Sequence, residues 1–384
     1  MEGLFDGAYR GATVLVTGHT GFKGSWLASW LDLLGAKVVG YALPPPDDRP
    51  SHFEATRIES RTDSVFADIR DLDRLVEVFE AFKPEFVFHL AAQSLVRPSY
   101  AEPVGTTTTN VVGTVHVLEA IRRVSSVRAA VIVTTDKCYE NDESGRPYRE
   151  SDRLGGYDPY SASKAAAEIM TACYRQSFFN PDRAGSSVAG IATARAGNVI
   201  GGGDWATDRL IPDAVTALSE GRDFVVRNPR SVRPWQHVLE PLSGYLWLGA
   251  RLAAEPGRFA SAWNFGPDPG GDLSVRDVAD AAVAAWGSGR WVDGSAGQDA
   301  ALHEAASLRL DCTRAHEELS WRPVWNVPEA VRTTIEWYRA FYQSRPFDAA
   351  SFTESQIESY TRRAHEGGLA WAAAVEHQDA GEAR

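Results

Sequence analysis

The sequence predicts an α/β fold: a doubly wound parallel Rossmann sheet with a smaller, irregular C-terminal substrate-binding lobe. Two observations support this prediction. In the first half of the chain, short apolar segments alternate with helical patterns, and a glycine-rich turn joins the first apolar segment to the first helix. Near-continuous apolar strands that alternate with helices are typical of a parallel sheet covered on both faces.

The elements follow from these patterns in chain order. Strands are expected at 13–17, 37–43, 64–69, 85–92, 129–136 and 188–197. Helices are expected at 22–35, 71–82, 103–124 and 159–179, and Asp71 is expected to be the N-cap of the second of these. After Asn198 the segments become rich in turn residues, as in GGGDW and PDPGGD, which predicts the second lobe.

Composition excludes several classes of protein. The chain has 384 residues with 44% hydrophobic and 23% charged side chains, which is ordinary for a globular protein. A net charge of −12 disfavours binding to nucleic acid. No signal peptide and no apolar run of about 18 residues is found, so we expect no membrane segment. Cys138, Cys173 and Cys312 lack metal-ligand spacing, which predicts free thiols, at least partly buried, in a cytoplasmic protein without a metal.

The segment TGHTGFKG (17–24) lies between the first strand and the first helix. Its glycines, Gly18, Gly21 and Gly24, permit a tight turn, a close approach of a pyrophosphate and tight packing of helix against strand. The helix N-terminus adds about half a positive charge. The segment therefore predicts a dinucleotide site.

The sequence favours NAD as the dinucleotide but leaves NADP open. After the second strand, where an acidic residue usually holds the ribose hydroxyls, the chain reads GYALPPP, and Arg49 follows. Asp68, at the end of the third strand, is expected to contact the adenine amino group. The alternative role for Asp68 is to cap a helix.

The segment YSASK places Tyr160 and Lys164 on one face of a helix. The lysine and a positive nicotinamide are expected to lower the tyrosine pKa from about 10 by ~3 units, so that the tyrosine can act as a base. Thr135, at the end of the preceding strand, is expected to orient the reacting hydroxyl. Asp136 and Lys137 follow directly, although hydride transfer alone does not require them.

These segments together resemble the extended short-chain dehydrogenase/reductases, the NAD-dependent epimerase/dehydratase family. More narrowly, the chain is similar to the CDP-glucose 4,6-dehydratases. The similarity covers residues 10–360 or so and rests on segments that include TGHTGFKGSWL, HLAAQSLVRPSY, TTDKCYEN, GGYDPYSASKAAAE, GNVIGGGDW and RPWQHVLEPLSGYL. It implies NAD as cofactor, a nucleotide-sugar substrate with CDP-glucose favoured, and a homodimer built through the helices at 103–124 and 159–179.

The resemblance also implies the chemistry. A hydride leaves C4 of the hexose with Tyr160 as base, water is eliminated across C5 and C6, and the hydride returns to C6 to give CDP-4-keto-6-deoxyglucose. Asp136 is assigned as general acid and Lys137 as the C5 base, where many relatives carry glutamate. A lysine base requires its pKa of about 10.4 to fall by ~3 units. Alternatively, Lys137 holds Asp136 or a substrate hydroxyl, or the two form a solvated ion pair at the strand end.

The remaining site residues are assigned by their positions in the motifs. The expected cofactor contacts are Gly18, Thr20, Gly21, Phe22, Gly24, Asp68, Ile69, Ala91, Tyr160 and Lys164. The expected substrate contacts are Arg97, Ser99, Asn198, Arg209 and Arg233, with surface ion pairs as the alternative role of the arginines. We expect the side chains of His89, His237, Trp26 and Trp30 to belong to the core.

Three other functions stay open from the sequence. A sugar-nucleotide 4-epimerase would share Tyr160 and Lys164 but would not need Asp136 and Lys137. A dehydratase that also inverts C5 would use the same residues. A non-catalytic dinucleotide-binding protein would typically lack the Tyr–Lys pair.

The predicted domain organisation follows from the same resemblance. Residues 1–198, with about 234–265, are expected to form the NAD-binding domain. Residues 199–233 and 266–368 are expected to form the nucleotide-sugar-binding lobe, and 369–384 a polar tail.

Overall fold

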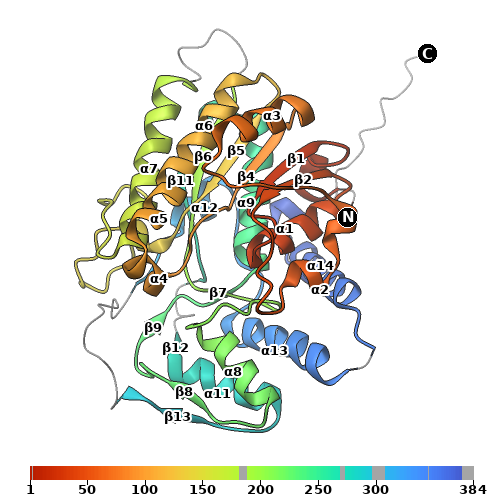
Figure 1. Cartoon of the computed structure of the whole chain (residues 1–384), viewed down its shortest axis with the longest axis vertical. Coiled ribbons are helices and arrows are strands. Elements are labelled where there is room, and N and C mark those ends of the chain that lie inside the picture. The colour runs from red at the N-terminus through yellow and green to blue at the C-terminus, as the bar shows by residue number, and fades with distance from the viewer. Residues whose placement is uncertain (2, 181–187, 269–272, 296–307, 345, 374–384) are drawn as a thin grey trace.

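A seven-stranded parallel sheet forms the centre of the larger lobe (Figure 1). The computed structural model describes residues 1, 3–180, 188–268, 273–295, 308–344 and 346–373. The strand order is β11-β6-β5-β4-β1-β2-β3, and every neighbouring pair is parallel. The strands are β1 (Thr13–Thr17), β2 (Lys37–Ala42), β3 (Asp63–Phe66), β4 (Phe86–His89), β5 (Ala129–Val133), β6 (Gly190–Ala196) and β11 (Ala262–Phe265). The strand order reverses between β1 and β4, which is where such sheets bind dinucleotides.

Helices cover both faces of the sheet (Figure 1). On one face lie α3 (Leu72–Phe82), α6 (Gly113–Arg123) and α7 (Pro159–Ser177); on the other lie α1 (Phe22–Leu33) and α9 (Leu239–Ala254). The alternation along β1 divides the core, since Val14 and Val16 join the cluster with α1 and Leu15 joins the cluster with α6. A doubly wound sheet buried on both faces confirms the predicted fold class.

The segment expected as one helix at 103–124 contains a π-helical turn. Helix α5 (Pro103–Thr107) leads into η3 (Thr108–Val112) and then into α6. Asn110 in this turn donates to Ser163 Oγ on α7 at 2.8 Å and to the Gln93 carbonyl at 2.9 Å. Single π turns often occur at functional sites, and this one ties the loop after β4 to the helix that carries Tyr160.

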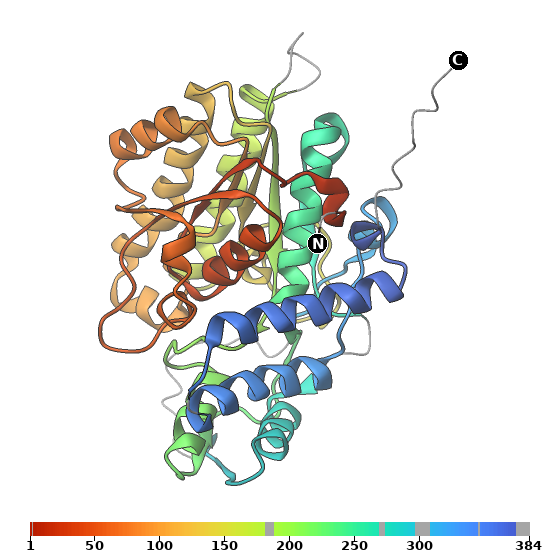
Figure 2. The ribbon, with the colours of Figure 1, turned by 90° about the vertical axis from the view of Figure 1, so that its right-hand side faces the viewer.

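The second lobe lies below the sheet in Figure 1 and is seen from the side in Figure 2. Its helices are α8 (Leu210–Ser219), α11 (Val275–Trp286) and α13 (Val327–Gln343). Its strand pairs are β8 (Phe224–Val226) with β13 (Trp291–Asp293), and β9 (Val232–Arg233) with β12 (Leu273–Ser274). A third pair, β7 (Val199–Ile200) with β10 (Gln236–His237), connects this lobe to the sheet.

The C-terminal part of the described chain returns to the larger lobe. Helix α14 (Ala349–Glu366) packs against α1, and η6 (Ala370–Ala372) packs against η1 (Leu4–Gly7). Within the predicted polar tail, Trp371 is buried and stacks on Phe5 with ring centroids 5.1 Å apart. Residues 374–384 of that tail lie outside the described residues, and the predicted domain boundaries stay a prediction.

The remaining elements are short. They are α2 (His52–Ala55), η2 (Ile58–Arg61), α4 (Val96–Ala101), η4 (Asp136–Cys138), α10 (Pro256–Phe259) and α12 (Thr313–Glu318). Asp71 caps α3 as predicted, accepting from the Arg74 N–H at 3.0 Å. Strands β3, β4 and β5 end three residues before their predicted ends, and the residues that follow form loops above the sheet.

Three expectations from composition can be compared with the described residues. None of their helices is long and apolar enough to cross a membrane. They contain no group of acidic, histidine or cysteine side chains arranged to hold a metal ion. All three cysteines are free; Cys138 and Cys312 are buried, but Cys173 is exposed on α7, so the expectation of burial is wrong for that thiol.

Candidate active site

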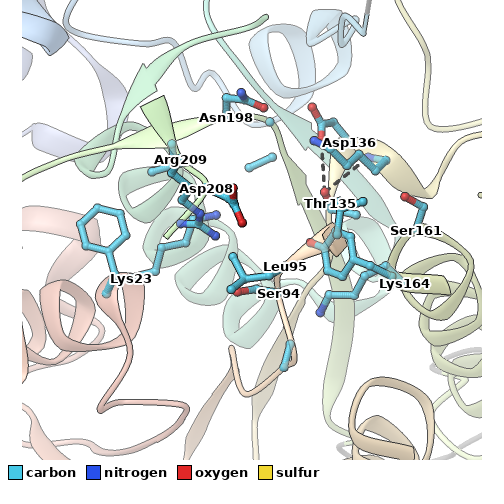
Figure 3. Close-up of a pocket in the computed structure, with 18 of the residues that line it drawn as sticks. Lys23, Ser94, Leu95, Thr135, Asp136, Ser161, Lys164, Asn198, Asp208 and Arg209 are labelled. Atoms are coloured by element: carbon cyan, nitrogen blue, oxygen red, sulfur yellow. Dashed lines mark hydrogen bonds and ion pairs between the residues drawn. The ribbon is translucent and has the colours of Figure 1, made fainter. Parts of the chain in front are cut away.

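A large cavity lies at the carboxyl ends of the sheet strands, between the sheet and the second lobe (Figure 3). Its volume is about 1700 Å³, and its lining extends from the β1–α1 loop to α8 and β8. This exceeds the ~300–1,000 Å³ that a pocket for one small ligand usually occupies. The cavity is therefore large enough for two nucleotide-sized ligands placed end to end.

The β1–α1 loop forms a cradle that only glycine permits. Gly18 has φ 75°, and a Cβ there would lie 2.7 Å from the Ala91 nitrogen. A Cβ on Gly24 would lie 2.0 Å from the Gly18 carbonyl oxygen. Helix α1 begins at its N-cap Gly21 with no side-chain cap, which leaves its first N–H groups available to an anion. These features fit the pyrophosphate of a dinucleotide.

The predicted adenosine contacts also lie at this end of the cavity. Thr20, Phe22, Asp68, Ile69 and Ala91 all line it. Asp68 binds Arg70 with an Oδ2–Nη2 distance of 2.6 Å, and this hydrogen bond lowers the pKa of the carboxyl. The alternative role of Asp68 as a helix cap is wrong, since Asp71 caps α3.

Arg49, which left NADP open, lies apart from this site. It pairs with Asp48 at 3.8 Å and is not among the residues that line the cavity.

Tyr160 and Lys164 face the end of β5 as predicted. Tyr160 hydrogen-bonds Thr135, and Lys164 Nζ donates to the Val133 carbonyl at 3.0 Å. The N-cap of α7, Asp158, accepts from the Ser161 N–H at 2.9 Å and fixes the start of the helix just before the tyrosine. The end of β5 and the start of α7 together form the centre of the site.

The expected effect of Lys164 on the pKa of Tyr160 is not found in the protein by itself. Burial raises the pKa of Tyr160 to about 12, with the Thr135 hydrogen bond opposing the rise. Burial also lowers the pKa of Lys164 to about 8. Desolvation is the largest effect on each group, because both lie in the same dry pocket. The positive nicotinamide is then the remaining predicted source of stabilisation for a phenolate.

Asp136 and Lys137 are in contact with each other. Figure 3 shows Asp136 beside Thr135. Asp136 is 1% exposed, and its Oδ1 accepts from Thr135 Oγ1 at 3.0 Å and from Lys137 Nζ at 3.4 Å. Its other oxygen, Oδ2, is buried without a partner in the described structure. The ion pair of the alternative assignment is therefore present, but its carboxylate is buried and only Lys137, whose side chain is 34% exposed, is partly solvated. A buried, unpartnered oxygen is a natural contact for a substrate hydroxyl.

A buried network behind the strand end holds this arrangement. Glu168, one turn after Lys164, accepts from Thr134, from Thr193 at 2.7 Å, and from Arg195 Nη2 at 2.8 Å. Strands β5 and β6 and helix α7 thus meet at one carboxylate. The network fixes the backbone from which the Thr135 and Asp136 side chains project.

The predicted substrate cations line the far side of the cavity. Arg209 pairs with Asp204 at 2.8 Å, and Arg97 lies 3.9 Å from Asp208. Arg233 donates to the Val232 carbonyl at 3.0 Å and still lines the cavity, as does Asn198. Figure 3 shows Arg209 and Asp208 across the cavity from Thr135.

Ser99 does not contact the cavity, so its predicted role as a ligand contact is wrong. It is fully buried, and its Oγ accepts from the Tyr160 N–H at 3.2 Å while donating to the Val96 carbonyl at 2.6 Å. Ser99 lies in α4, which packs against α7 and places it under the start of that helix. It therefore positions the tyrosine rather than the substrate.

The predicted core assignments are confirmed. His89 lies between Thr17 (2.7 Å from Nδ1) and Thr114 (3.0 Å from Nε2), and His237 is buried. Trp26 and Trp30 are fully buried.

Lys23 is a cavity residue that the sequence analysis missed. It lies inside the glycine-rich segment, and its side chain points toward Arg209 (Figure 3). Burial, with Arg209 adding to the effect, lowers the pKa of its amine to about 7. A basic residue within a glycine-rich phosphate loop was the available signal.

Comparison with known proteins places the chain in a family. Residues 15–259 match the family model of GDP-mannose 4,6 dehydratase. The chain belongs to this family. It is 46% identical to the CDP-glucose 4,6-dehydratase of Salmonella typhimurium over 354 residues, which covers 92% of this chain and 97% of that protein. It is 28% identical to the UDP-glucose 4-epimerase of Mycolicibacterium smegmatis over 85% of this chain and 98% of that one.

A solved structure agrees with the fold of this GDP-mannose 4,6 dehydratase family member. The UDP-glucose 4-epimerase of Brucella ovis, in complex with NAD, superimposes with a TM-score of 0.70 at 25% identity. The match covers 84% of this chain and 97% of that one. The predicted resemblance to the epimerase/dehydratase enzymes is confirmed.

Replacing Gly24 by Ala is expected to weaken NAD binding at least ~10-fold, because the new Cβ would meet the Gly18 carbonyl and push α1 off the cradle. Titration of protein fluorescence with NAD measures the effect. Gly105→Ala is the matched control, since a Cβ there has only an ordinary contact at 3.9 Å. Unchanged affinity in the Gly24 variant would show that the glycine-rich loop is not part of the cofactor site.

Proposed function

We propose that this protein is an NAD-dependent CDP-glucose 4,6-dehydratase, a hydro-lyase that forms CDP-4-keto-6-deoxyglucose. The observation that carries the proposal is the buried Thr135–Asp136–Lys137 group beside Tyr160. Oxidation at C4 needs only the tyrosine and the threonine. Elimination of water needs a second acid and base, and Asp136 and Lys137 supply one of each.

The cofactor in this proposal is NAD. Support comes from the glycine cradle, from the position of Arg49 outside the cavity, and from the NAD-bound epimerase of B. ovis. When bound, NAD takes up the hydride from C4 and gives it back at C6. Its positive ring also favours the ionised form of Tyr160.

The protein residues then move the protons. Tyr160 takes the proton of the C4 hydroxyl while Thr135 orients that hydroxyl. The 4-ketone acidifies the C5 proton, which Lys137 removes, and Asp136 protonates the departing C6 hydroxyl. Lys137 returns its proton to C5 as the hydride arrives at C6. The substrate loses one water, with no net oxidation.

The hydrogen bonds of the site close this proton cycle. At the end of the reaction Tyr160 holds the proton from the C4 hydroxyl, and Asp136 has lost one to the leaving water. Thr135 contacts both groups, since it hydrogen-bonds Tyr160 and donates to Asp136 Oδ1 at 3.0 Å. We infer that its hydroxyl passes the proton from Tyr160 to Asp136, which returns both residues to their starting protonation states.

A 4-epimerase is the second candidate, because a relative with that activity covers most of the chain. An epimerase would have no use for a buried acid with an unpartnered oxygen next to a lysine. The dehydratase accounts for both groups.

We propose that the enzyme acts in the cytoplasm, where nucleotide sugars are made and used.

The test of the function is incubation of the purified protein with CDP-glucose and a catalytic amount of NAD, followed by mass spectrometry. We expect the nucleotide sugar to lose the mass of one water without accumulation of NADH. Lys137→Ala should slow water loss by ~10²–10⁴ while NAD is still reduced in the first step. Inversion at C4 without water loss, read from the NMR spectrum of the sugar because the mass does not change, would establish the epimerase instead.

The proton transfer through Thr135 predicts different outcomes for two substitutions. Thr135→Ser keeps the hydroxyl, and its turnover rate should stay within about tenfold of the wild type. Thr135→Val keeps the shape but not the hydroxyl, and its turnover rate should fall ~10²–10³-fold. Steady-state rates with CDP-glucose measure both. A loss in Thr135→Ser with full turnover in Thr135→Val would mean that the methyl group, and not the hydroxyl, matters.

We propose that the enzyme is a homodimer formed through the helical segments at 103–123 and 159–177. Both carry exposed apolar side chains, among them Val104 (74% exposed) and Ile169 (56% exposed). Such side chains on neighbouring surface helices are typical of an interface with a second copy.

Light scattering at micromolar concentration should give twice the monomer mass of 41.9 kDa, and Ile169→Glu should shift the population toward monomer. A wild-type monomer at that concentration would contradict the proposal.

A further inference from the structure

The cavity continues beyond the catalytic residues into the second lobe. If the proposed function holds, the hexose lies at Tyr160 beside the cofactor, so the diphosphate and nucleoside must extend the other way. That direction leads past Arg209 to the start of α8 and to β8. Asp213, Val225, Arg227 and Asn228 line this far end. It is the part of the cavity that the base of the substrate would occupy.

Three carboxylates lie on the loop before α8 and in its first turn, and two of them already have side-chain partners. Asp204 binds Arg209 at 2.8 Å and the Ala206 N–H at 3.0 Å. Asp208 binds Arg227 at 2.8 Å. Their oxygens are therefore engaged within the protein.

Asp213 is the third carboxylate and differs from the other two. It accepts a hydrogen bond from the Asp208 backbone, and within the described chain it has no side-chain hydrogen bond or close ion pair. It lines the cavity from the first turn of α8. Its side chain is exposed where it lines the cavity, so its remaining acceptor positions are accessible to a ligand.

An apolar surface lies at the same end. Val225 on β8 lines the cavity and is 58% exposed, although its neighbours Phe224 and Val226 are buried. A flat heterocyclic ring would cover this exposed side chain. Carboxylate, apolar surface and the Arg227 guanidinium together suit an amino-substituted pyrimidine.

We propose that Asp213 determines the base specificity of the enzyme by accepting a hydrogen bond from the exocyclic amine of cytosine. Cytosine presents an amine donor at N4, whereas uracil and thymine present an O4 acceptor at the same place. An ionised carboxylate only accepts, so it attracts the amine and repels O4. Burial raises the pKa of Asp213 to about 6, which leaves the group mainly ionised at neutral pH.

Asp213→Asn tests the assignment. The amide keeps the size of the side chain and can still accept from Asp208, but it can also donate to O4. Titration calorimetry of the NAD-loaded protein with CDP and UDP is expected to show CDP affinity falling ~10- to 100-fold and UDP affinity rising. The ratio of kcat/KM for CDP-glucose and UDP-glucose should shift in the same direction.

Asp223→Asn is the matched control, because it changes a carboxylate just before β8 that is bound to Arg290 and does not line the cavity. Its CDP-to-UDP affinity ratio should equal that of the wild type. An unchanged ratio in the Asp213 variant would overturn the assignment. Equal weakening of both nucleotides would also overturn it, since Asp213 would then hold the ribose.

The binding measurement separates this inference from the proposed function. If Asp213 determines a preference for CDP but the protein removes no water from CDP-glucose, the assignment of Asp213 stands and the proposed dehydratase function is wrong. If the protein removes water from CDP-glucose but its preference for CDP does not depend on Asp213, the dehydratase function stands and the assignment of Asp213 is wrong.

Discussion

The buried ion pair between Glu168 and Arg195 joins the three elements that build the catalytic centre. Both side chains are 3% exposed and lie 2.8 Å apart, and the carboxylate also binds Thr134 at the end of β5 and Thr193 in the middle of β6. Removing one partner of such a pair leaves a buried charge, at a cost of about 3–5 kcal/mol. The direction in which Thr135 and Asp136 point depends on this interaction, and the proposed chemistry depends on that direction.

Burial has opposite effects on the acids and bases of the site. It raises the pKa of Tyr160 to about 12 and lowers those of Lys164 and Lys23 to about 8 and 7. In each case the dry pocket disfavours the charged form. A pocket with these properties is prepared for ligands that bring charge of their own. A positive nicotinamide would favour the negative form of Tyr160. A negative diphosphate would favour the positive form of the lysines.

Several site residues could be predicted because their positions follow from local rules. The glycine cradle, Thr135, Tyr160 and Lys164 lie at strand ends and helix starts that periodicity and capping identify, and all of them line the cavity. Ser99 was misplaced because the π turn and α4 decide which way the loop after β4 faces. The ion pair between Asp68 and Arg70 was not predicted, because the sequence analysis weighed only an adenine contact and a helix cap for this carboxylate.

The amino-acid sequence was sufficient to predict the doubly wound sheet, the phosphate cradle and the residues at the end of β5, since alternating apolar segments, glycine spacing and strand ends are local patterns of the chain. Packing of the folded chain determines which carboxylate near α8 has no side-chain partner among the described residues, and it buries Asp136. It also decided that Lys23 faces the substrate side. These properties arise from packing between segments far apart in the chain, and neither periodicity nor motif spacing records the solvent exposure that such packing leaves.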